Sequence, residues 1–138
     1  MGRKGKAGRL YSRLIMEQPP PVEEDTIFGK IARKEIPSNV VYEDDQVLAF
    51  RDIAPQAPIH IVLIPKVKDG LTQLSRVEER HKALLGHLVY VAAEIARKEG
   101  LAEDGWRLVI NDGRNAGQTV FHLHLHILGG REMAWPPG

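Results

Sequence analysis

The alternation of apolar and polar positions is strongest near the carboxyl end of the chain, where histidines alternate with apolar residues from Phe121 to Leu128. A β-strand points successive side chains to opposite faces, so this pattern predicts a strand with a row of imidazoles on one face. The row consists of His122, His124 and His126. The apolar residues between them would lie on the other face, buried in a core.

Shorter apolar runs predict most of the remaining elements. Asp25 or Thr26 can cap a short helix at residues 27–34, which Pro37 would end. Four further strands are predicted at residues 40–42, 47–52, 59–64 and 106–110, with the first two joined as a hairpin.

Apolar residues recur at a period close to 3.6 over residues 77–95, which predicts one long helix. Ser75 and Glu78 form a capping box that would start this helix, and Gly100 would close it. About five strands, joined mainly by hairpins, indicate an antiparallel α+β domain with one long and one short helix over residues 25–138.

The composition is that of a single globular domain. The chain has 138 residues, of which 43% are hydrophobic and 27% are charged. No apolar run approaches the roughly 18–20 residues that cross a bilayer, so we expect no membrane partner. The absence of cysteine excludes disulfides, thiolate nucleophiles and cysteine-based zinc sites. We expect a cytoplasmic protein that could also be nuclear.

The charge is unevenly distributed along the chain. Residues 1–13 hold five of the 19 basic residues and none of the 18 acidic ones, so residues 14–138 are mildly acidic. An acidic body argues against a nucleic-acid partner. Residues 1–24 are basic and then proline-rich, which predicts a flexible tail. Residues 1–16 lack acids, and mitochondrial targeting is therefore a minor alternative.

Three explanations compete for the histidine row. Imidazoles at adjacent same-face positions can share one zinc ion. Alternatively, one neutral imidazole attacks an electrophile while its neighbours orient it and donate hydrogen bonds to developing charge. The histidines could also be ordinary polar side chains on an outer face. The spacing alone does not separate metal from nucleophile, but a strand has no structural need for such a row.

A glycine-rich loop immediately precedes the row and contains Gly113, Gly117, Gln118 and Thr119. Glycine lets backbone N–H groups approach phosphate oxygens closely. The loop lacks the Gly-Lys-Ser/Thr sequence of a P-loop NTPase. Beside the histidine row, it favours a phosphate-containing ligand.

The segment from His122 to Leu128 resembles the histidine triad motif, His-φ-His-φ-His-φ-φ, in which φ is apolar. The resemblance extends to residues 25–31, 50–60 and 129–138, the last of which end in Trp-Pro-Pro-Gly. Residues 25–138 are thus similar to the histidine triad (HIT) superfamily, in its nucleotide-binding, phosphoramidase branch. The resemblance implies a HIT-like fold whose antiparallel sheet continues across the two-fold axis of a homodimer.

The resemblance also implies a purine nucleoside phosphoramidase that needs no metal or other cofactor. Such an enzyme hydrolyses adenosine 5′-phosphoramidates and related aminoacyl-adenylates to AMP and an amine. His124 would attack the α-phosphorus through Nε2, with its Nδ1 held by a backbone carbonyl, and water would release the nucleotide from the covalent intermediate. His126 would bind a phosphate oxygen, while His122 and His60 would form a supporting relay behind the nucleophile.

The remaining site residues follow from the same resemblance. Asp52 would hold the ribose hydroxyls, although an acid at this position could simply stabilise a turn. The purine would be enclosed by Ile27, Phe28, Ile31, Phe50 and Ile53, which a core would suit equally well. The phosphate would be bound by Asn111, Gly117, Gln118 and Thr119.

In the implied dimer, the long helix and a central strand would meet their copies, with Val89, Val91 and Ala92 as candidate contacts. Trp135 would reach the partner's active site. One rival is a dinucleoside polyphosphate hydrolase of the same superfamily, which the Trp-Pro-Pro-Gly ending argues against. Another is a nucleotide- or zinc-binding regulatory scaffold that acts through protein partners. The presence of Asp52 and of all four histidines of the implied site, His60, His122, His124 and His126, favours retained catalysis.

Overall fold

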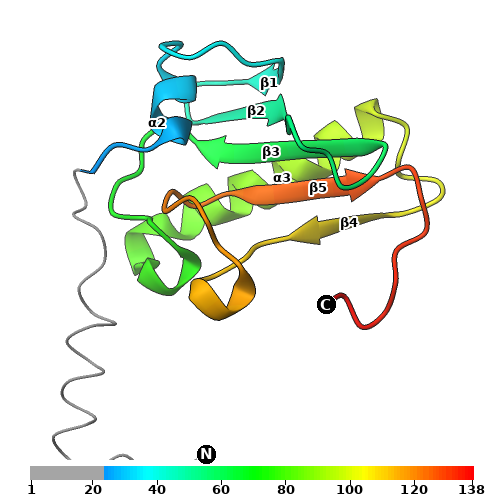
Figure 1. The fold of residues 1–138 in the computed structure, drawn as a ribbon. Helices are drawn as coiled ribbons and strands as arrows, with labels where there is room; N and C mark the ends of the chain where they lie inside the picture. Colours follow the sequence, from blue (N-terminus) through cyan, green and yellow to red (C-terminus); the bar gives the residue numbers. More distant parts are fainter. Residues whose placement is uncertain (1–23) are drawn as a thin grey trace, which may run out of the picture.

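One sheet of five antiparallel strands, in the order β1-β2-β3-β5-β4, forms the centre of the domain (Figure 1). The computed structural model describes residues 24–138, so the predicted tail lies outside the described residues except for Glu24. The strands are β1 (Val40–Glu43), β2 (Val47–Arg51), β3 (Ile59–Pro65), β4 (Trp106–Val109) and β5 (Leu125–Gly129). The predicted antiparallel α+β fold is confirmed.

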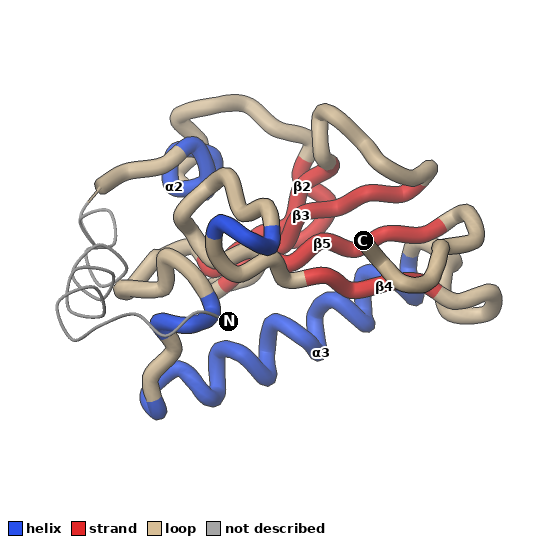
Figure 2. The backbone as a smooth tube through the Cα atoms, turned by 60° about the horizontal axis from the view of Figure 1, so that its bottom comes forward, coloured by secondary structure: helices blue, strands red, loops and turns tan. Residues whose placement is uncertain are grey.

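Helices cover both faces of this sheet (Figure 2). The long helix α3 (Lys82–Lys98) lies along one face, and the short helix α2 (Ile27–Ala32) lies on the other. Three single 3₁₀ turns complete the described elements: η1 (Leu74–Arg76), η2 (Glu79–His81) and η3 (Arg114–Ala116). No helix within residues 24–138 is long and apolar enough to cross a membrane.

Successive residues of β2 and β3 point to opposite faces and divide between two apolar clusters. The cluster beneath α3 includes Val47, Ala49, Ile61, Leu63, Leu123, Leu125 and Ile127. The cluster beneath α2 consists of Ile31, Leu48, Phe50, Val62 and Ile64. The apolar residues between the histidines are therefore buried in the core, as predicted. Burying each such leucine or isoleucine stabilises the fold by about 1.5–3 kcal/mol.

Helix α2 begins as predicted but ends before Pro37. The hydroxyl of Thr26 accepts a hydrogen bond from the Gly29 N–H, which caps the first turn. At the other end, Lys34 adopts a left-handed conformation with φ of 64°. The N–H groups of Lys34 and Glu35 then bond back to carbonyls within the helix, which is the Schellman arrangement.

Helix α3 begins at Lys82, later than the predicted capping box of Ser75 and Glu78. The hydroxyl of Ser75 donates to the carboxylate of Asp112 in the glycine-rich loop, so it does not cap a helix. A capping box is present, but it joins Glu78 to His81 at the start of η2. The Ser75 prediction is wrong because a contact distant in sequence takes the hydroxyl.

Two of the three residues on α3 that were candidates for contact with a second copy are buried inside the chain. Val91 and Ala92 are buried against the sheet, whereas Val89 is exposed beside Tyr90. The helix ends at Lys98, and Gly100 follows with φ of 76°, which agrees with the predicted closure.

Candidate active site

Strand β5 begins only after the first two histidines of the row. Continuing the register of β3 and β5 would place Pro65 opposite Leu123. Pro65 has no N–H, and its carbonyl accepts a hydrogen bond from Nε2 of His122 at 2.7 Å. The Leu123 N–H instead donates to the Leu71 carbonyl at 2.8 Å. The predicted strand is therefore too long, because His122 and His124 lie ahead of the first residue of β5 and outside its ladder.

The histidine row nevertheless lies together beneath α2. His122 is 1% exposed and His124 is 5% exposed, so these are not polar side chains on an outer face. The Phe28 ring of α2 makes edge contacts with both, at centroid distances of 6.2 and 4.9 Å. The rings of His124 and His126 lie 5.0 Å apart. One helix side chain thus covers the first two members of the row.

A main-chain carbonyl fixes the tautomer of His124. Its Nδ1 lies 2.7 Å from the carbonyl oxygen of His122, which can only accept a hydrogen bond. Nδ1 therefore carries the proton, and the lone pair of the neutral ring is on Nε2. This arrangement confirms the expected carbonyl contact and leaves the Nε2 lone pair of His124 without a proton, as a nucleophile would require.

A second chain of hydrogen bonds fixes the tautomer of His126. The Gln56 N–H donates to Nδ1 of His60 at 3.0 Å, so the proton of neutral His60 is on Nε2. Nε2 of His60 lies 2.9 Å from Nδ1 of His126 and donates to it. Neutral His126 consequently carries its own proton on Nε2. That N–H is a suitable donor to an anionic oxygen.

Burial keeps these rings neutral. It lowers the pKa of both His122 and His126 to about 4, and it lowers the pKa of His124 and His60 below the ordinary 6.5. The charge of Asp52 opposes the shift at His60 but does not cancel it. At neutral pH the site therefore presents one imidazole lone pair and one imidazole N–H donor.

The two predicted relay members lie in different places. His122 supports His124 through its main-chain carbonyl, whereas His60 contacts His126 across the β3–β5 pair. Asp52 lies beside His60, with 3.5 Å between Oδ2 and Nε2. Its other oxygen accepts the Ala54 N–H at 2.8 Å, as a turn acid would. Asp52 thus combines a turn contact with a place at the edge of the site.

All six residues predicted for the purine and ribose line one pocket of about 380 Å³. They are Ile27, Phe28, Ile31, Phe50, Asp52 and Ile53. Ile53 lies at the rim and is 99% exposed, while Phe28 packs edge-on against Phe50 at 5.6 Å. The volume lies within the range of small-molecule sites. Phe28 links this pocket to His124, so a bound base would lie next to that ring.

The glycine-rich loop gives Gln118 a different task from the predicted one. Its Oε1 accepts the Gly113 N–H at 2.8 Å, and its Nε2 donates to the carbonyls of Thr72 and Val120 at 2.7 and 3.0 Å. Both amide protons are used, so this side chain clamps the loop. Thr119 and Gly117 are exposed, and Asn111 is partly buried. Thr119 lines a second pocket of about 570 Å³, which shares Ile27 with the first.

Three supporting groups carried no sequence signal. The Gln56 N–H and the Pro65 carbonyl orient His60 and His122, but every residue has main-chain groups of this kind. Arg131 holds the Gln56 carbonyl through Nε at 3.2 Å and Nη2 at 2.9 Å. A buried histidine that needs two partners is the clue that such groups exist.

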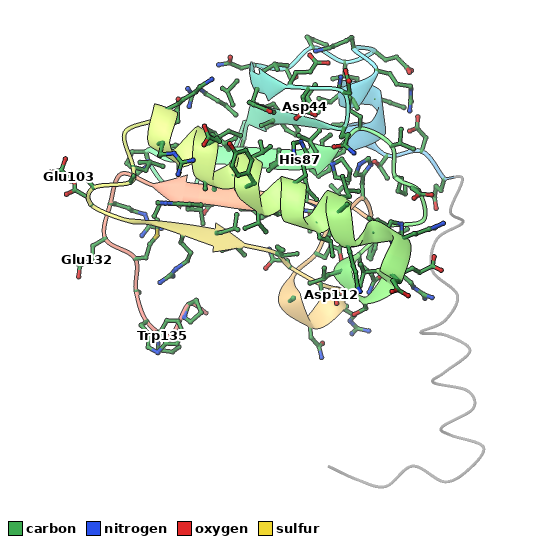
Figure 3. All side chains as sticks on the ribbon, turned by 180° about the vertical axis from the view of Figure 1, so that it is seen from behind. Asp44, His87, Glu103, Asp112, Glu132 and Trp135 are labelled. Atoms are coloured by element: carbon green, nitrogen blue, oxygen red, sulfur yellow. The ribbon has the colours of Figure 1, made fainter. Side chains whose placement is uncertain are left out.

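Trp135 lies away from the site of its own chain. It is 83% exposed and projects from the carboxyl-terminal segment beyond β4 (Figure 3). Arg107 of β4 holds this segment through the Ala134 carbonyl at 3.0 Å. Trp135 lines neither of these two pockets.

One cluster within residues 24–138 has the donors of a metal site. Asp52, His60 and His126 each offer a ligand atom, and these atoms lie within 4.8 Å of one another. Zinc accepts two imidazoles and a carboxylate. However, the proton that Gln56 fixes on His60 Nε2 occupies the line between the two imidazoles. The donors fit zinc by type, but a metal would have to displace this proton and its hydrogen bond.

An antiparallel α+β domain with a buried row of neutral histidines beside a small apolar pocket is the arrangement expected of the histidine triad superfamily. Comparison with known proteins agrees with this class. The HIT domain matches residues 33–133. A 14 kDa zinc-binding protein of Zea mays is 65% identical over 116 residues, 84% of this chain and 90% of the relative. Adenylylsulfatase HINT1 of Arabidopsis thaliana is 63% identical over 118 residues, 86% of this chain and 80% of the relative.

A solved HIT family hydrolase of Legionella pneumophila Philadelphia 1 superposes with a TM-score of 0.79. It is 48% identical, and the match covers 83% of this chain and 100% of that one. The chain belongs to the HIT family. Two of these relatives are named for an enzymatic activity, and the maize relative is named for zinc binding.

Proposed function

We propose that the protein hydrolyses adenosine 5′-phosphoramidates to AMP and an amine, and related aminoacyl-adenylates to AMP and an amino acid, through a covalent nucleotide on His124. The observation that carries this proposal is the pair of fixed tautomers in adjacent rings. His124 offers a lone pair on Nε2, and His126 offers an N–H on Nε2. Phosphoryl transfer needs positioning and charge stabilisation above all, and these two groups supply a nucleophile and an oxyanion donor.

The reaction has two displacements. In the first, the His124 Nε2 lone pair forms a bond to the α-phosphorus, and the P–N bond of the substrate breaks as the amine leaves with a proton taken from solvent. In the second, water forms the new P–O bond and releases a proton to solvent, the P–Nε2 bond breaks and AMP is released. His126 donates to a non-bridging oxygen in both steps. The purine occupies the pocket beside Phe28, and Asp52 holds the ribose.

The homodimer is part of this proposal. Strand β4 forms one edge of the sheet, and Val89 and Tyr90 are exposed on the neighbouring α3. Trp135 projects on the β4 side of the sheet (Figure 3), which suits contact with a second copy and its active site. Sedimentation of the purified protein tests the dimer.

Adenosine 5′-phosphoramidate, with and without EDTA, tests the activity. We expect turnover that resists EDTA and is lost in His124→Ala. His87→Gln is the matched control, since His87 lies on α3 and pairs with Asp44 at 2.7 Å on the far face of the sheet (Figure 3). Loss of turnover with EDTA would contradict metal-free chemistry, and inactivity of the wild type would contradict the proposal.

Adenylyl sulfate hydrolysis is a second candidate, favoured by the name of the Arabidopsis relative at 63% identity. It uses the same attack on the α-phosphorus with sulfate as the leaving group. Comparing kcat/KM for adenylyl sulfate, adenosine 5′-phosphoramidate and diadenosine polyphosphates ranks these substrates. We expect the phosphoramidate to rank first.

A zinc-binding scaffold is the third candidate, favoured by the name of the maize relative and by the Asp52, His60 and His126 cluster. Calorimetric titration with ZnCl₂ tests it. Tight binding that His60→Asn abolishes, without phosphoramidate turnover, would favour the scaffold over the enzyme.

A further inference from the structure

Two buried polar atoms have no hydrogen-bond partner within residues 24–138: Oγ1 of Thr72 and Nδ1 of His122. The Leu123 N–H donates to the Leu71 carbonyl, and Thr72 and His122 are the chain neighbours of these two residues. Their side chains therefore lie near one another. Both residues also line the same pocket, between α2 and the segment that follows β3. Buried polar atoms are nearly always hydrogen-bonded, so this pair needs a partner.

The two atoms are complementary. Nε2 of His122 donates to the Pro65 carbonyl, so Nδ1 carries the lone pair and can only accept. A threonine hydroxyl can donate and rotates about one bond. The main chain of Thr72 is already held. Its N–H donates to the Gly70 carbonyl at 3.0 Å, and its carbonyl accepts a hydrogen bond from Gln118 Nε2 at 2.7 Å. With the main chain held, rotation of the Thr72 side chain about one bond is the motion that is left to orient the hydroxyl.

We propose that the Thr72 hydroxyl donates a hydrogen bond to Nδ1 of His122, which makes Thr72 a positioning residue for the histidine row. His122 is then held at both ring nitrogens, by Thr72 and by Pro65. Its carbonyl is the group that holds Nδ1 of His124, so a fixed His122 also fixes the nucleophile. Thr72 acts through His122 and does not touch the substrate. The hydrogen bond stands independently of the reaction, while its effect on turnover rests on the proposed function.

Nuclear magnetic resonance of protein labelled with ¹⁵N-histidine tests the hydrogen bond directly. Thr72→Val keeps the side-chain shape without the hydroxyl, and Thr72→Ser keeps the hydroxyl. The Nδ1 resonance of His122, assigned by its loss in His122→Asn, moves downfield when its lone pair loses a donor. We expect this shift in Thr72→Val and a wild-type position in Thr72→Ser. A His122 resonance that is unchanged by Thr72→Val would overturn the proposal.

Steady-state kinetics test the positioning role. We expect Thr72→Val to lower kcat by about 3- to 10-fold, the usual scale of one hydrogen bond, with KM unchanged and activity restored in Thr72→Ser. An equal loss in both variants would overturn the role, because the hydroxyl would then be irrelevant. A wild type that does not hydrolyse phosphoramidates would contradict the proposed function alone, since the resonance experiment still decides the hydrogen bond.

Discussion

Nε2 of His60 lies 2.9 Å from Nδ1 of His126, and this contact determines which nitrogen of His126 is left to donate to a ligand. The Gln56 N–H occupies the other nitrogen of His60, so His60 is the donor in the pair. The two histidines lie on paired strands of the sheet, β3 and β5, which fixes their distance. A backbone N–H thus sets the proton position two rings away.

Replacing His60 tests this chain of hydrogen bonds. His60→Ala removes the donor to His126 Nδ1, so the proton of His126 can move to Nδ1 and Nε2 loses its donor role. We expect kcat for adenosine 5′-phosphoramidate to fall by about 10-fold or more. His60→Gln keeps an N–H donor and is expected to lose less. Equal activity of His60→Ala and wild type would show that His126 does not depend on His60.

The pH profile tests the neutral state of the nucleophile. Burial lowers the pKa of His124 below 6.5, and protonation of its Nε2 removes the lone pair that attacks phosphorus. Activity is therefore present above the lowered pKa and is lost as the pH falls through it. We expect kcat/KM, corrected for spontaneous hydrolysis, to stay level from about pH 8 to pH 6.5 and to fall below that. A midpoint above pH 6.5 would contradict a buried, neutral nucleophile.

Phe28 is expected to contribute to nucleotide affinity. Its ring contacts Phe50 and His124 and lines the pocket assigned to the purine. We expect Phe28→Leu to raise the Kd of AMP by about 5-fold, since one aromatic contact is worth roughly 1 kcal/mol beyond the apolar area it buries. Isothermal titration calorimetry measures this Kd. An unchanged Kd would place the purine elsewhere.

Gln118 is expected to stabilise the fold. Gln118→Ala leaves the Thr72 and Val120 carbonyls and the Gly113 N–H without this partner. We expect the free energy of unfolding in urea to fall by about 1–3 kcal/mol. Asn115→Ala, on an exposed residue of the same loop, is the matched control and is expected to change stability little. A stable Gln118→Ala protein with weakened AMP binding would instead support the phosphate role.

The sequence predicts the sheet well because alternation is a local property. Leu123, Leu125 and Ile127 alternate with histidines, and all three lie in the core beneath α3. The strand nonetheless starts later than its pattern suggests. Its first half would pair with Pro65, whose missing N–H and engaged carbonyl end the ladder. A pattern within one segment does not show what the opposite strand can offer.

Among the site residues, too, local patterns were predictable and contacts with distant parts of the chain were not. The row of histidines and the pocket around Phe28 follow from residue types in a recognisable motif. The tasks of Gln118 and Ser75 do not, because both side chains bond to groups far away in the sequence. The tautomers of His124 and His126 depend on main-chain atoms of His122 and Gln56, which no residue type reveals.

The central claim, attack by His124 on phosphorus, is tested most directly by stereochemistry. A P-chiral adenosine 5′-phosphoramidothioate hydrolysed in ¹⁸O-water gives a labelled thiophosphate whose configuration can be measured. Two in-line displacements, the first by His124 and the second by water, predict overall retention at phosphorus. Overall inversion would mean that water attacks the substrate once and directly, and it would contradict a covalent nucleotide on His124.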